Sequence, residues 1–333
     1  MGHTTDNLAQ PMFRRMLYSF HMPLFFMLSG MSMSLKPLRT LSEFRDLLKK
    51  NVLSLLVPYL IWGLIYSQSG YSLLPNLLYG SWEGLDRLKT LTSLWYLTCF
   101  FCARIYVALV LTALDRLRVR NAALGCAICA PVIFAVGMLL PHPENGAFLC
   151  CDIAFTAAAF ILVGIAFKKI CILFSQQKTL YLVLAAVISA VCFACGTILR
   201  GDALSLSLMC KAAYGNVFWF VFDSLAGSAL VMSVSMLIAR LSRESAHPFS
   251  TAAISYIGQR TMGIYLVHKQ LMYYLLMPVL NRLLEPKVPA VLISLIAAGI
   301  MLPVCCGLCA VIERTIPQLF GQFPKKQNAP AKS

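Results

Sequence analysis

The sequence predicts an all-α protein, a polytopic bundle of helices that crosses a membrane about nine times. Of its 333 residues, 59% are hydrophobic and only 12% are charged, whereas about a quarter of a typical soluble domain is charged. The apolar residues form runs long enough to cross a bilayer, which takes about 20 helical residues. The basic residues gather between these runs. We therefore expect residues 1–333 to form a single integral-membrane domain in a lipid bilayer.

The apolar runs give the spans in order. They lie near residues 20–36, 52–69, 93–114, 121–140, 153–167, 179–198, 217–239, 262–280 and 289–312. Residues 1–19 are short and polar and lack the apolar core of a signal peptide. No gap is long enough for a folded domain outside the membrane. Any chemistry is therefore expected within the bundle or at its two mouths.

The basic residues predict which mouth faces the cytoplasm. Of the 28 lysines and arginines, 18 lie in one set of alternating gaps and eight in the other, with Arg104 and Lys269 inside spans. Cytoplasmic loops carry the excess of basic residues, which puts residues 1–19 outside and the tail 313–333 in the cytoplasm. Topology thus accounts for the net charge of +15, and we expect no nucleic-acid partner.

The 13 cysteines lie mostly inside the spans, and four pairs have CxxC spacing. No histidine or carboxylate accompanies these pairs, as a metal site would require. We interpret them as small apolar residues of membrane helices, and we expect no metal.

The first span begins with the stretch Phe20–Gly30, which carries a histidine and a proline near its start. Pro23 has no backbone N–H and is tolerated in the first turn of a helix, so we expect the helix to start close to His21. Ser29 and Gly30 are small enough to let a neighbouring helix approach closely. An ordinary helix with an interfacial histidine and a functional site both fit this stretch.

The gap before the second span, residues 35–51, is basic and amphipathic. Arg45, Lys49 and Lys50 could anchor it to anionic lipid or could bind phosphate groups.

The third span opens with Trp95 and Tyr96, which an aromatic belt at the interface would explain. Arg104 lies nine residues further on, about 14 Å deeper at 1.5 Å per residue. An arginine inside the membrane is expected to face the bundle interior and to have a partner. Asp223, also inside a span, is a possible counter-ion.

Polar residues also mark the fifth and eighth spans. Asp152 begins the fifth and could cap its helix. In the eighth, Thr261, Tyr265 and His268 have the spacing i, i+4, i+7 and share one face. They could form a buried hydrogen-bond network or line a site.

Two further histidines, His142 and His247, lie beside prolines in the gaps between spans. We interpret them as solvated loop residues.

Two stretches together resemble a known family. Phe20–Gly30 closely resembles the second-helix signature of acyltransferase family 3, and Tyr256–His268 resembles its Ile-Gly, hydroxyl residue, Tyr-Leu-Leu-His segment. Leu94–Leu97, Asp152–Gly164, Asn216–Gly227 and Ile312–Arg314 extend the likeness through nearly all the spans in order. Members of this family move acyl groups, usually acetyl, onto hydroxyls of sugars and glycans.

The resemblance implies a reaction and its substrates. Acyl-CoA, most often acetyl-CoA, would be the donor substrate, with its phosphates at Arg45, Lys49 and Lys50. The family usually carries paired arginines there, where this chain has lysines. The acceptor would be a sugar or glycan hydroxyl outside the cytoplasm or on a lipid carrier, as in polysaccharide modification of the cell envelope. Its binding site would be formed by His21, Trp95, Tyr96, Arg104, Asp152, Thr261 and Tyr265.

The resemblance also implies a catalytic histidine. His3 matches it, in a Met1-Gly2-His3 stretch that looks like the end of a longer helix whose basic residue is absent here. A family member with that helix would have ten spans. A three-residue stub cannot hold an imidazole at a fixed depth, and a general base must lie within hydrogen-bond reach of its partner, so we expect this 333-residue chain to be inactive or nearly so.

His268 is the second candidate for catalysis, since imidazole has an ordinary pKa of about 6.5 and can take a hydroxyl proton. Arg104, Tyr265 or His268 could stabilise the oxyanion of the reaction.

Two other functions stay open. A truncated, non-catalytic family member would fit the short front end. A transporter or exporter of a glycan or lipid precursor would fit the many spans, although no convincing internal repeat is present. The sequence implies no tightly bound cofactor and leaves the acceptor and the oligomeric state open.

Overall fold

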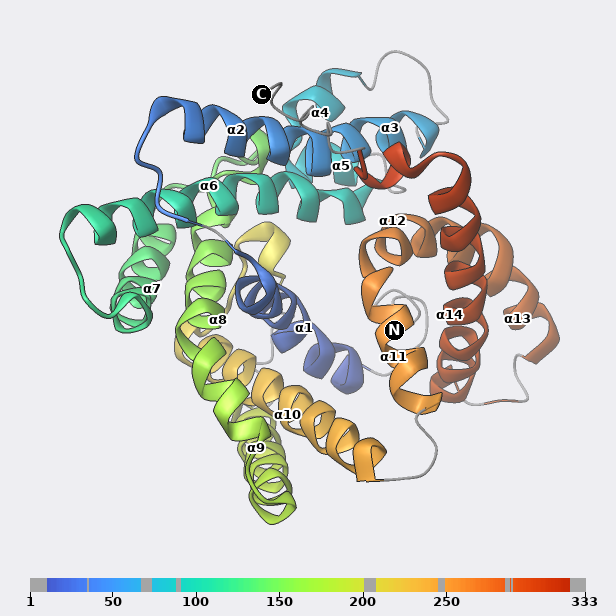
Figure 1. Ribbon diagram of the computed structural model, residues 1–333. Helices are drawn as coiled ribbons and strands as arrows, with labels where there is room; N and C mark the ends of the chain where they lie inside the picture. The colour runs from blue at the N-terminus through green and yellow to red at the C-terminus, as the bar shows by residue number, and fades with distance from the viewer. Residues whose placement is uncertain are drawn as a thin grey trace, which may run out of the picture.

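The computed structural model describes residues 11–34, 36–66, 74–87, 91–200, 208–244, 249–284, 288 and 290–323. Within these ranges every named element is helical, and the one β-bridge, between Leu208 and Ala213, stands alone. The expected all-α helical bundle is confirmed (Figure 1).

The α-helices run in chain order. They are α1 (Pro11–Ser32), α2 (Leu41–Asn51), α3 (Val57–Tyr66), α4 (Leu74–Tyr79), α5 (Trp82–Asp86), α6 (Trp95–Arg116), α7 (Ala122–Leu139), α8 (Ile153–Ser175), α9 (Thr179–Arg200), α10 (Val217–Glu244), α11 (Phe249–Gln259), α12 (Thr261–Leu271), α13 (Met277–Leu284) and α14 (Ala290–Thr315). Short 3₁₀ turns are η4 (Thr92–Leu94), η5 (Phe148–Cys150), η7 (Met209–Lys211) and η9 (Pro317–Phe320). Two π-helical turns, η2 (Val52–Leu56) and η8 (Met272–Leu276), join α2 to α3 and α12 to α13.

Seven helices in the described part of the chain are long and apolar enough to cross a membrane. They are Leu41–Tyr66, Thr92–Arg116, Ala122–Leu139, Phe148–Ser175, Thr179–Leu199, Val217–Ser242 and Leu292–Thr315. The predicted spans 20–36 and 262–280 are also largely helical, as part of α1 and of the α12–η8–α13 helix, but they are not among the seven. The total of nine spans therefore stays a prediction.

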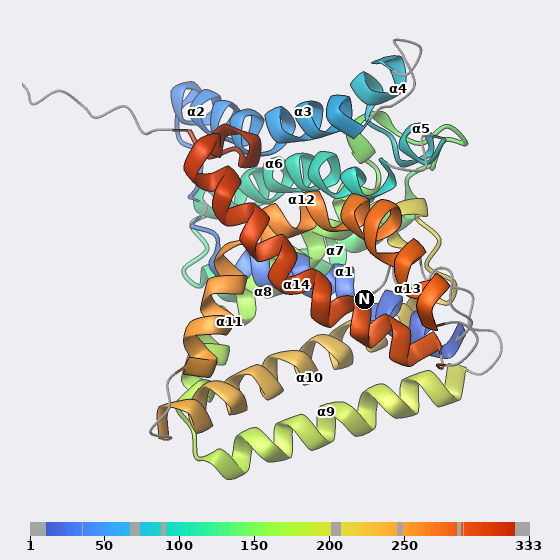
Figure 2. The same ribbon diagram turned by 90° about the vertical axis from the view of Figure 1, so that its right-hand side faces the viewer.

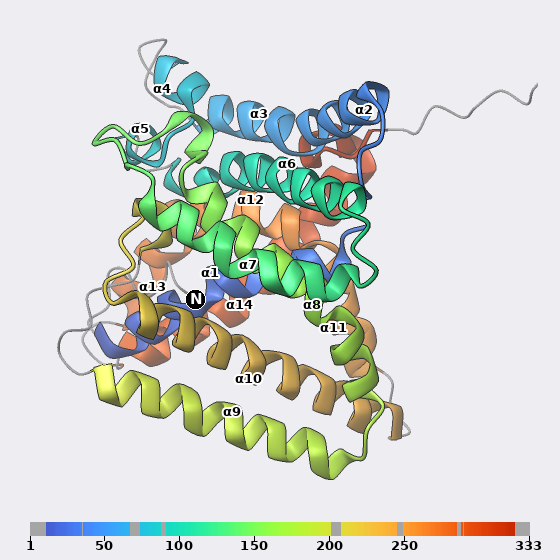
Figure 3. The ribbon, with the colours of Figure 1, turned by 90° about the vertical axis from the view of Figure 1, so that its left-hand side faces the viewer.

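The long helices lie roughly side by side and define two ends of the bundle (Figures 2 and 3). We call one the α5 end; it holds α4, α5, η7 and the connection between α7 and α8. The other, the α11 end, holds α11, the start of α2 and the turns after α6 and α8.

α1 begins at Pro11, so the predicted start near His21 is wrong, and Pro23 lies inside the helix. A proline there removes the hydrogen bond to the carbonyl four residues earlier, which is that of Ser19. The hydroxyl of Ser224 on α10 donates to this carbonyl at 2.8 Å. A neighbouring helix thus satisfies the carbonyl that Pro23 leaves, and α1 continues beyond the proline to Ser32.

α8 lies at the centre of the bundle against α1, α6 and α7. Glycines permit its close approach to α1. A Cβ on Gly30 would collide with the backbone carbonyl of Ile161, and a Cβ on Gly164 would collide with that of Met27. The expected role of Gly30 in close helix packing is confirmed.

Both π turns lie just before a proline: η2 before Pro58 and η8 before Pro278. A π turn is a local widening of the α-helix that occurs frequently at functional sites. Here η2 follows the basic helix α2 and η8 follows the helix of His268.

The 3₁₀ turn η9, after α14, closes onto α3. The indole nitrogen of Trp62 donates to the carbonyl of Leu319 at 2.8 Å, and the ring of Phe320 stacks on Trp62 with centroids 6.1 Å apart. Gly321 has a φ of 69°, and a Cβ there would press on the backbone of Ser54. The last described turn of the chain is thus packed on the second long helix.

Candidate functional site

The two family-like stretches meet around one face of α6. Tyr96, Phe100 and Arg104 are four residues apart, so they share that face. The ring of Tyr96 lies 5.4 Å from Phe100, 5.0 Å from Phe26 of α1 and 5.3 Å from Tyr265 of α12. We call the region where these four rings meet the α1–α6–α12 seam. Three helices that are distant in sequence thus bring predicted site residues together.

Tyr265 and His268 lie on the α12 side of this seam. The Tyr265 hydroxyl is buried and makes no hydrogen bond of good geometry within the described chain. The ring of His268 lies 6.1 Å from that of Tyr265, and its Nδ1 is 2.8 Å from the Tyr265 carbonyl and 3.0 Å from the Ile264 carbonyl. Since a carbonyl only accepts, Nδ1 carries the hydrogen and Nε2 is the basic nitrogen.

Arg104 lies near the middle of the α6 span, with its guanidinium carbon 5.7 Å from the centre of the Phe100 ring. Its Nε is buried and has no hydrogen-bond partner in the part of the chain that the structure describes. Asp223, the possible counter-ion, has one carboxylate oxygen against Gly196 of α9, and no ion pair joins it to Arg104 among the described residues. Arg104 therefore makes no ion pair with the residues that the structure describes.

Trp95 and Thr261 have other surroundings. Trp95 is 8% exposed and lies edge-on to Tyr96, so it is a core residue rather than part of an exposed aromatic belt. Thr261 is exposed, and its hydroxyl donates to the Gly258 carbonyl at 2.8 Å, at the junction of α11 and α12. The structure thus separates Thr261 from Tyr265, although the two share a helical spacing.

Two charged neighbours of this region were not singled out by sequence. Lys269, beside His268, is buried and donates to the Thr92 hydroxyl. Arg260 forms an ion pair of 2.9 Å with Glu313 and lies 3.7 Å from the centre of the Tyr256 ring. These contacts fasten the two ends of α12 to η4 and α14.

His21 lies in the middle of α1. Its Nδ1 is 2.7 Å from the Leu17 carbonyl, so Nε2 is again the basic nitrogen, and its ring lies 5.0 Å from that of Tyr18. His3 and His247 lie outside the described residues.

Basic side chains line the surface of α2. Arg45, Lys49 and Lys50 are exposed, and the last two lie in the final α-helical turn, where the helix dipole favours cations. The start of α2 is fixed by a capping box between Thr40 and Glu43. The residues predicted to bind the acyl-CoA donor thus form one exposed basic surface.

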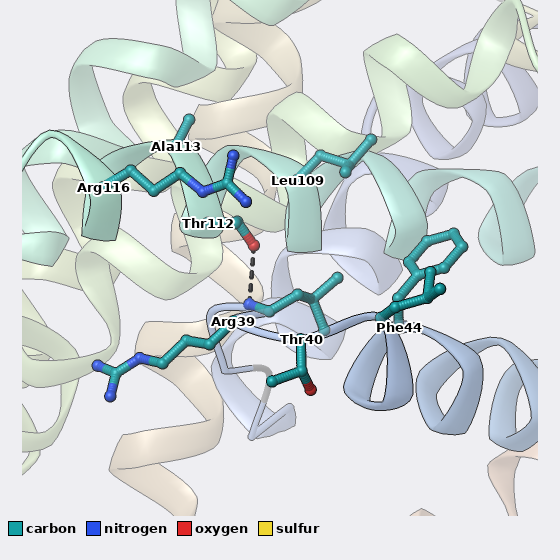
Figure 4. Close-up of a pocket in the computed structure, with 9 residues that line it drawn as sticks. Arg39, Thr40, Phe44, Leu109, Thr112, Ala113 and Arg116 are labelled. Atoms are coloured by element: carbon teal, nitrogen blue, oxygen red, sulfur yellow. Dashed lines mark hydrogen bonds between the residues drawn. The ribbon is translucent and has the colours of Figure 1, made fainter.

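A pocket of about 430 Å³ opens beside this surface at the α11 end, between the start of α2 and the end of α6 (Figure 4). Arg39 and Arg116 line it together with apolar side chains such as Phe44 and Leu109. Arg39 also forms an exposed ion pair of 3.3 Å with Asp115. The two arginines extend the basic surface of α2 to α6.

Asp152 and His142 form a pair at the α5 end. Nδ1 of His142 donates to Oδ2 of Asp152 at 3.0 Å; the side chains are 30% and 8% exposed. Asp152 makes no capping hydrogen bond to α8, and its Oδ1 is buried without a partner in the described chain. His142 is an exposed loop residue, as expected, but it is also paired with Asp152. A buried carboxylate orients its imidazole.

The connection between α7 and α8 is shaped to hold this pair. Leu149 and Cys150 have φ angles of 50° and 52°, which side-chain-bearing residues rarely adopt. Hydrogen bonds fasten the connection to its neighbours: Cys102 Sγ to the Leu149 carbonyl, Tyr106 hydroxyl to the Cys151 carbonyl, Cys150 Sγ to the Gly80 carbonyl and Tyr79 hydroxyl to the Gly146 carbonyl. Local sequence carries no signal for a pairing across such a turn.

A known protein family matches most of the chain. The family model for the acyltransferase 3 domain matches residues 1–310, which include nearly all the described helices. No curated protein and no solved structure matches the chain.

Proposed function

Because the chain belongs to acyltransferase family 3, we propose that it is a membrane O-acyltransferase. It would move an acyl group, most often acetyl, from cytoplasmic acyl-CoA to a hydroxyl of an extracytoplasmic or lipid-linked sugar or glycan. The observation that supports this best is the arrangement of His268 beside Tyr265 in the α1–α6–α12 seam. The two carbonyls at Nδ1 hold the imidazole in the tautomer that a general base requires.

In this proposal the acceptor oxygen attacks the thioester carbonyl while its proton passes to Nε2 of His268. The carbon–sulfur bond breaks, and CoA leaves as the thiol after taking up a proton. The Tyr265 hydroxyl and the Arg104 guanidinium are the donors for the oxyanion, since neither has another hydrogen-bonding partner among the described residues at its buried atom. His3 is the second candidate base, by its match to the family's catalytic histidine.

The remaining assignments follow from the two ends of the bundle. The excess of basic residues at the α11 end supports a cytoplasmic orientation for it and for the C-terminal tail. Arg45, Lys49 and Lys50 are exposed there and would bind the CoA phosphates. His21, Trp95, Tyr96 and Thr261 stay proposed contacts of the acceptor, together with Asp152 at the α5 end.

The test uses the purified chain in lipid nanodiscs with radiolabelled acetyl-CoA and a panel of neutral and acidic sugars. Transfer by the wild-type chain is measured first, because the resemblance led us to expect little or no activity, and clear transfer would overturn that expectation. His268→Gln should lower acetyl transfer by roughly 10²-fold or more, the usual contribution of a general base. Ser175→Ala, at the far end of α8, is the control. Unchanged transfer in His268→Gln would remove this residue from catalysis, and loss of folded protein in proportion to activity would assign it a structural role.

A further inference from the structure

The pocket of about 430 Å³ at the α11 end lies between two walls that hydrogen bonds hold together. The first wall is one face of the last two turns of α6, formed by Leu109, Thr112, Ala113 and Arg116. The second wall is the stretch that leads into α2. The backbone N–H of Leu38 in this stretch donates to the Thr112 hydroxyl at 2.8 Å, and that hydroxyl donates to the Ala108 carbonyl at 2.7 Å. The second wall is thus fastened to α6 (Figure 4).

The capping box of α2 shapes the second wall. The Glu43 carboxylate accepts from the backbone N–H groups of Arg39 and Thr40, at 2.6 and 3.3 Å, and the Thr40 hydroxyl accepts from the Glu43 N–H at 3.2 Å. The negative charge of Glu43 is therefore used within the cap. A hydroxyl that accepts one hydrogen bond can still donate its own hydrogen. Thr40, which lines the pocket, thus offers a donor to a ligand there.

The lining of the pocket changes from apolar to basic along α6. Leu109 lies seven residues before Arg116, which is about 10 Å at 1.5 Å per residue. It is 51% exposed inside the apolar span Thr92–Arg116, so its side chain faces lipid. Arg116 ends that span, at the level where the hydrocarbon of a bilayer gives way to its headgroups. The pocket therefore meets hydrocarbon at one end and charged groups at the other.

The charges at the basic end favour an anion. The segments 36–50 and 115–120 hold eight basic residues against three acidic ones. Arg116 makes no ion pair with the described residues, and its side chain extends toward Thr112 in Figure 4. Arg39 pairs with Asp115 at 3.3 Å, with its side chain 73% exposed, and such exposed pairs contribute little stability. An anion at Arg116 can therefore compete with Asp115 for Arg39.

A second pocket at the same end of the bundle differs in its lining. It has a volume of about 390 Å³ and lies between α8 and α9. Its lining residues, none of them charged, are Ile170, Leu173, Phe174, Gln177 and Tyr181. The two pockets are similar in size, so a hollow between two helices does not by itself gather arginines. The basic residues distinguish the pocket between α2 and α6 from a gap that a lipid tail alone would fill.

A soluble phosphate compound would use only the basic end of the pocket. CoA, whose phosphates we assign to Arg45, Lys49 and Lys50, has a nucleotide and a polar arm, which gain nothing from side chains that face lipid. A phospholipid uses both ends, because its phosphate is joined to acyl chains that extend into the hydrocarbon. Anionic lipids are also enriched in the cytoplasmic leaflet, the side proposed for the α11 end.

We propose that the pocket between α2 and α6 is a binding site for an anionic phospholipid of the leaflet at the α11 end. Arg116, Arg39 and the Thr40 hydroxyl bind the headgroup phosphate. One acyl chain lies against Phe44 and Leu109. The lipid joins the start of α2 to the end of α6, and its binding does not depend on the proposed acyl transfer.

The first arm of the test measures lipid affinity by native mass spectrometry of the full chain in detergent. Palmitoyl-oleoyl phosphatidylglycerol should bind more tightly than palmitoyl-oleoyl phosphatidylcholine, which has the same chains and no net charge. Arg116→Gln should weaken phosphatidylglycerol binding roughly fivefold or more, the usual effect of one basic residue beside an anionic headgroup. Arg120→Gln removes the same charge from an exposed residue outside the pocket lining. This control should change the affinity less than about twofold, because an exposed charge at a distance is screened.

The second arm separates the lipid from soluble phosphates. Ala113→Phe fills the pocket and keeps every charge, so it should also weaken phosphatidylglycerol binding, with the thermal unfolding temperature within a few degrees of the wild type. Neither glycerol 3-phosphate, which lacks the acyl chains, nor CoA should displace the lipid. Displacement by CoA would assign the pocket to the acyl donor instead. Equal affinity for the two lipids, or equal losses in Arg116→Gln and Arg120→Gln, would overturn the site.

Discussion

The hydroxyl of Ser224 donates a 2.8 Å hydrogen bond to the carbonyl of Ser19, the carbonyl that Pro23 leaves without a helical partner. Both serines are buried. This contact joins α1 to α10 at the point where α1 would otherwise expose an unsatisfied backbone group in a water-poor interior.

Removing the Ser224 hydroxyl should therefore destabilise the protein. Ser224→Ala leaves a buried acceptor unpaired, which costs about 1–3 kcal/mol. In a Pro23→Ala background residue 23 regains an N–H that can reach the Ser19 carbonyl, so Ser224→Ala should cost less there. Thermal unfolding of the two single variants and the double variant in detergent gives the coupling free energy between Pro23 and the Ser224 hydroxyl. Equal costs in both backgrounds would show that the two features are independent.

Gly30 should not tolerate a side chain. A Cβ at this position meets the backbone of Ile161, which cannot move as a flexible side chain can, so Gly30→Ala should cost about 1–3 kcal/mol by overpacking. Gly299 of α14 has no atom of the described residues within 4 Å of its would-be Cβ, and Gly299→Ala should be neutral or stabilising. Unfolding temperatures of the two variants test the close approach of α1 and α8. Equal effects would contradict it.

The exposed basic surface of α2 should bind CoA electrostatically. Replacing Arg45, Lys49 and Lys50 by alanine should weaken CoA binding, and more strongly as salt is lowered, because exposed charges act furthest when unscreened. Arg120, Lys169 and Lys178 are exposed at the same end, and their triple alanine variant makes the same change in net charge. Titration with CoA at several ionic strengths compares the CoA affinities of the two triple variants. Loss of affinity in both variants would indicate a general charge effect.

Glu83 should make stability depend on pH. Burial raises the pKa of its carboxyl above the ordinary 4.5, and the negative charges of Asp152 and Asp86 raise it further, against the lowering effects of its backbone hydrogen bond and Lys211. Folding thus favours the neutral acid, so this contribution to stability is present below pH 4.5 and is lost as the pH rises through the folded-state pKa.

Glu83→Gln keeps the shape and removes the charge. Its unfolding temperature should exceed that of the wild type at pH 7, and the difference should shrink as the pH falls toward about 4, where the wild-type carboxyl is protonated as well. Glu144→Gln makes the same chemical change on an exposed residue and is the matched control. A Glu83→Gln variant less stable than the wild type at pH 7 would contradict this assignment.

Sequence predicted the fold well because long apolar runs leave few structural choices in a bilayer. It failed at Pro23, where the rule that proline begins a helix assumes that no neighbour can supply a donor. Ser224 is such a neighbour, and it lies 205 residues away from Ser19.

The site was predictable only where its residues follow a helical period. Tyr265 and His268 are one helical turn apart, and their rings do lie together. Thr261 shows the limit of this argument. It shares their helical spacing, but it lies at the first position of α12 and is exposed, so a common helix face does not give it a common environment.

The pairing of His142 with Asp152 could not be predicted in this way. No helical period relates the two residues, because the chain between them turns through the left-handed backbone angles of Leu149 and Cys150. Such angles are rare for residues with side chains, and neither residue type signals them. Contacts from α6 and from Gly80 hold the turn, and they come from parts of the chain that are distant in sequence.

The packing of η9 on α3 also determines which step of bundle assembly comes last. The partner of the Trp62 indole, the Leu319 carbonyl, is 257 residues further along the chain. At a translation rate of about 5–20 residues per second, the ribosome adds Leu319 on the order of 10–50 s after Trp62. Until then the second long helix lies in the bilayer, or in the insertion machinery, without its final partner. Assembly of the bundle can therefore finish only after α14 has been inserted, however early the other helices pack.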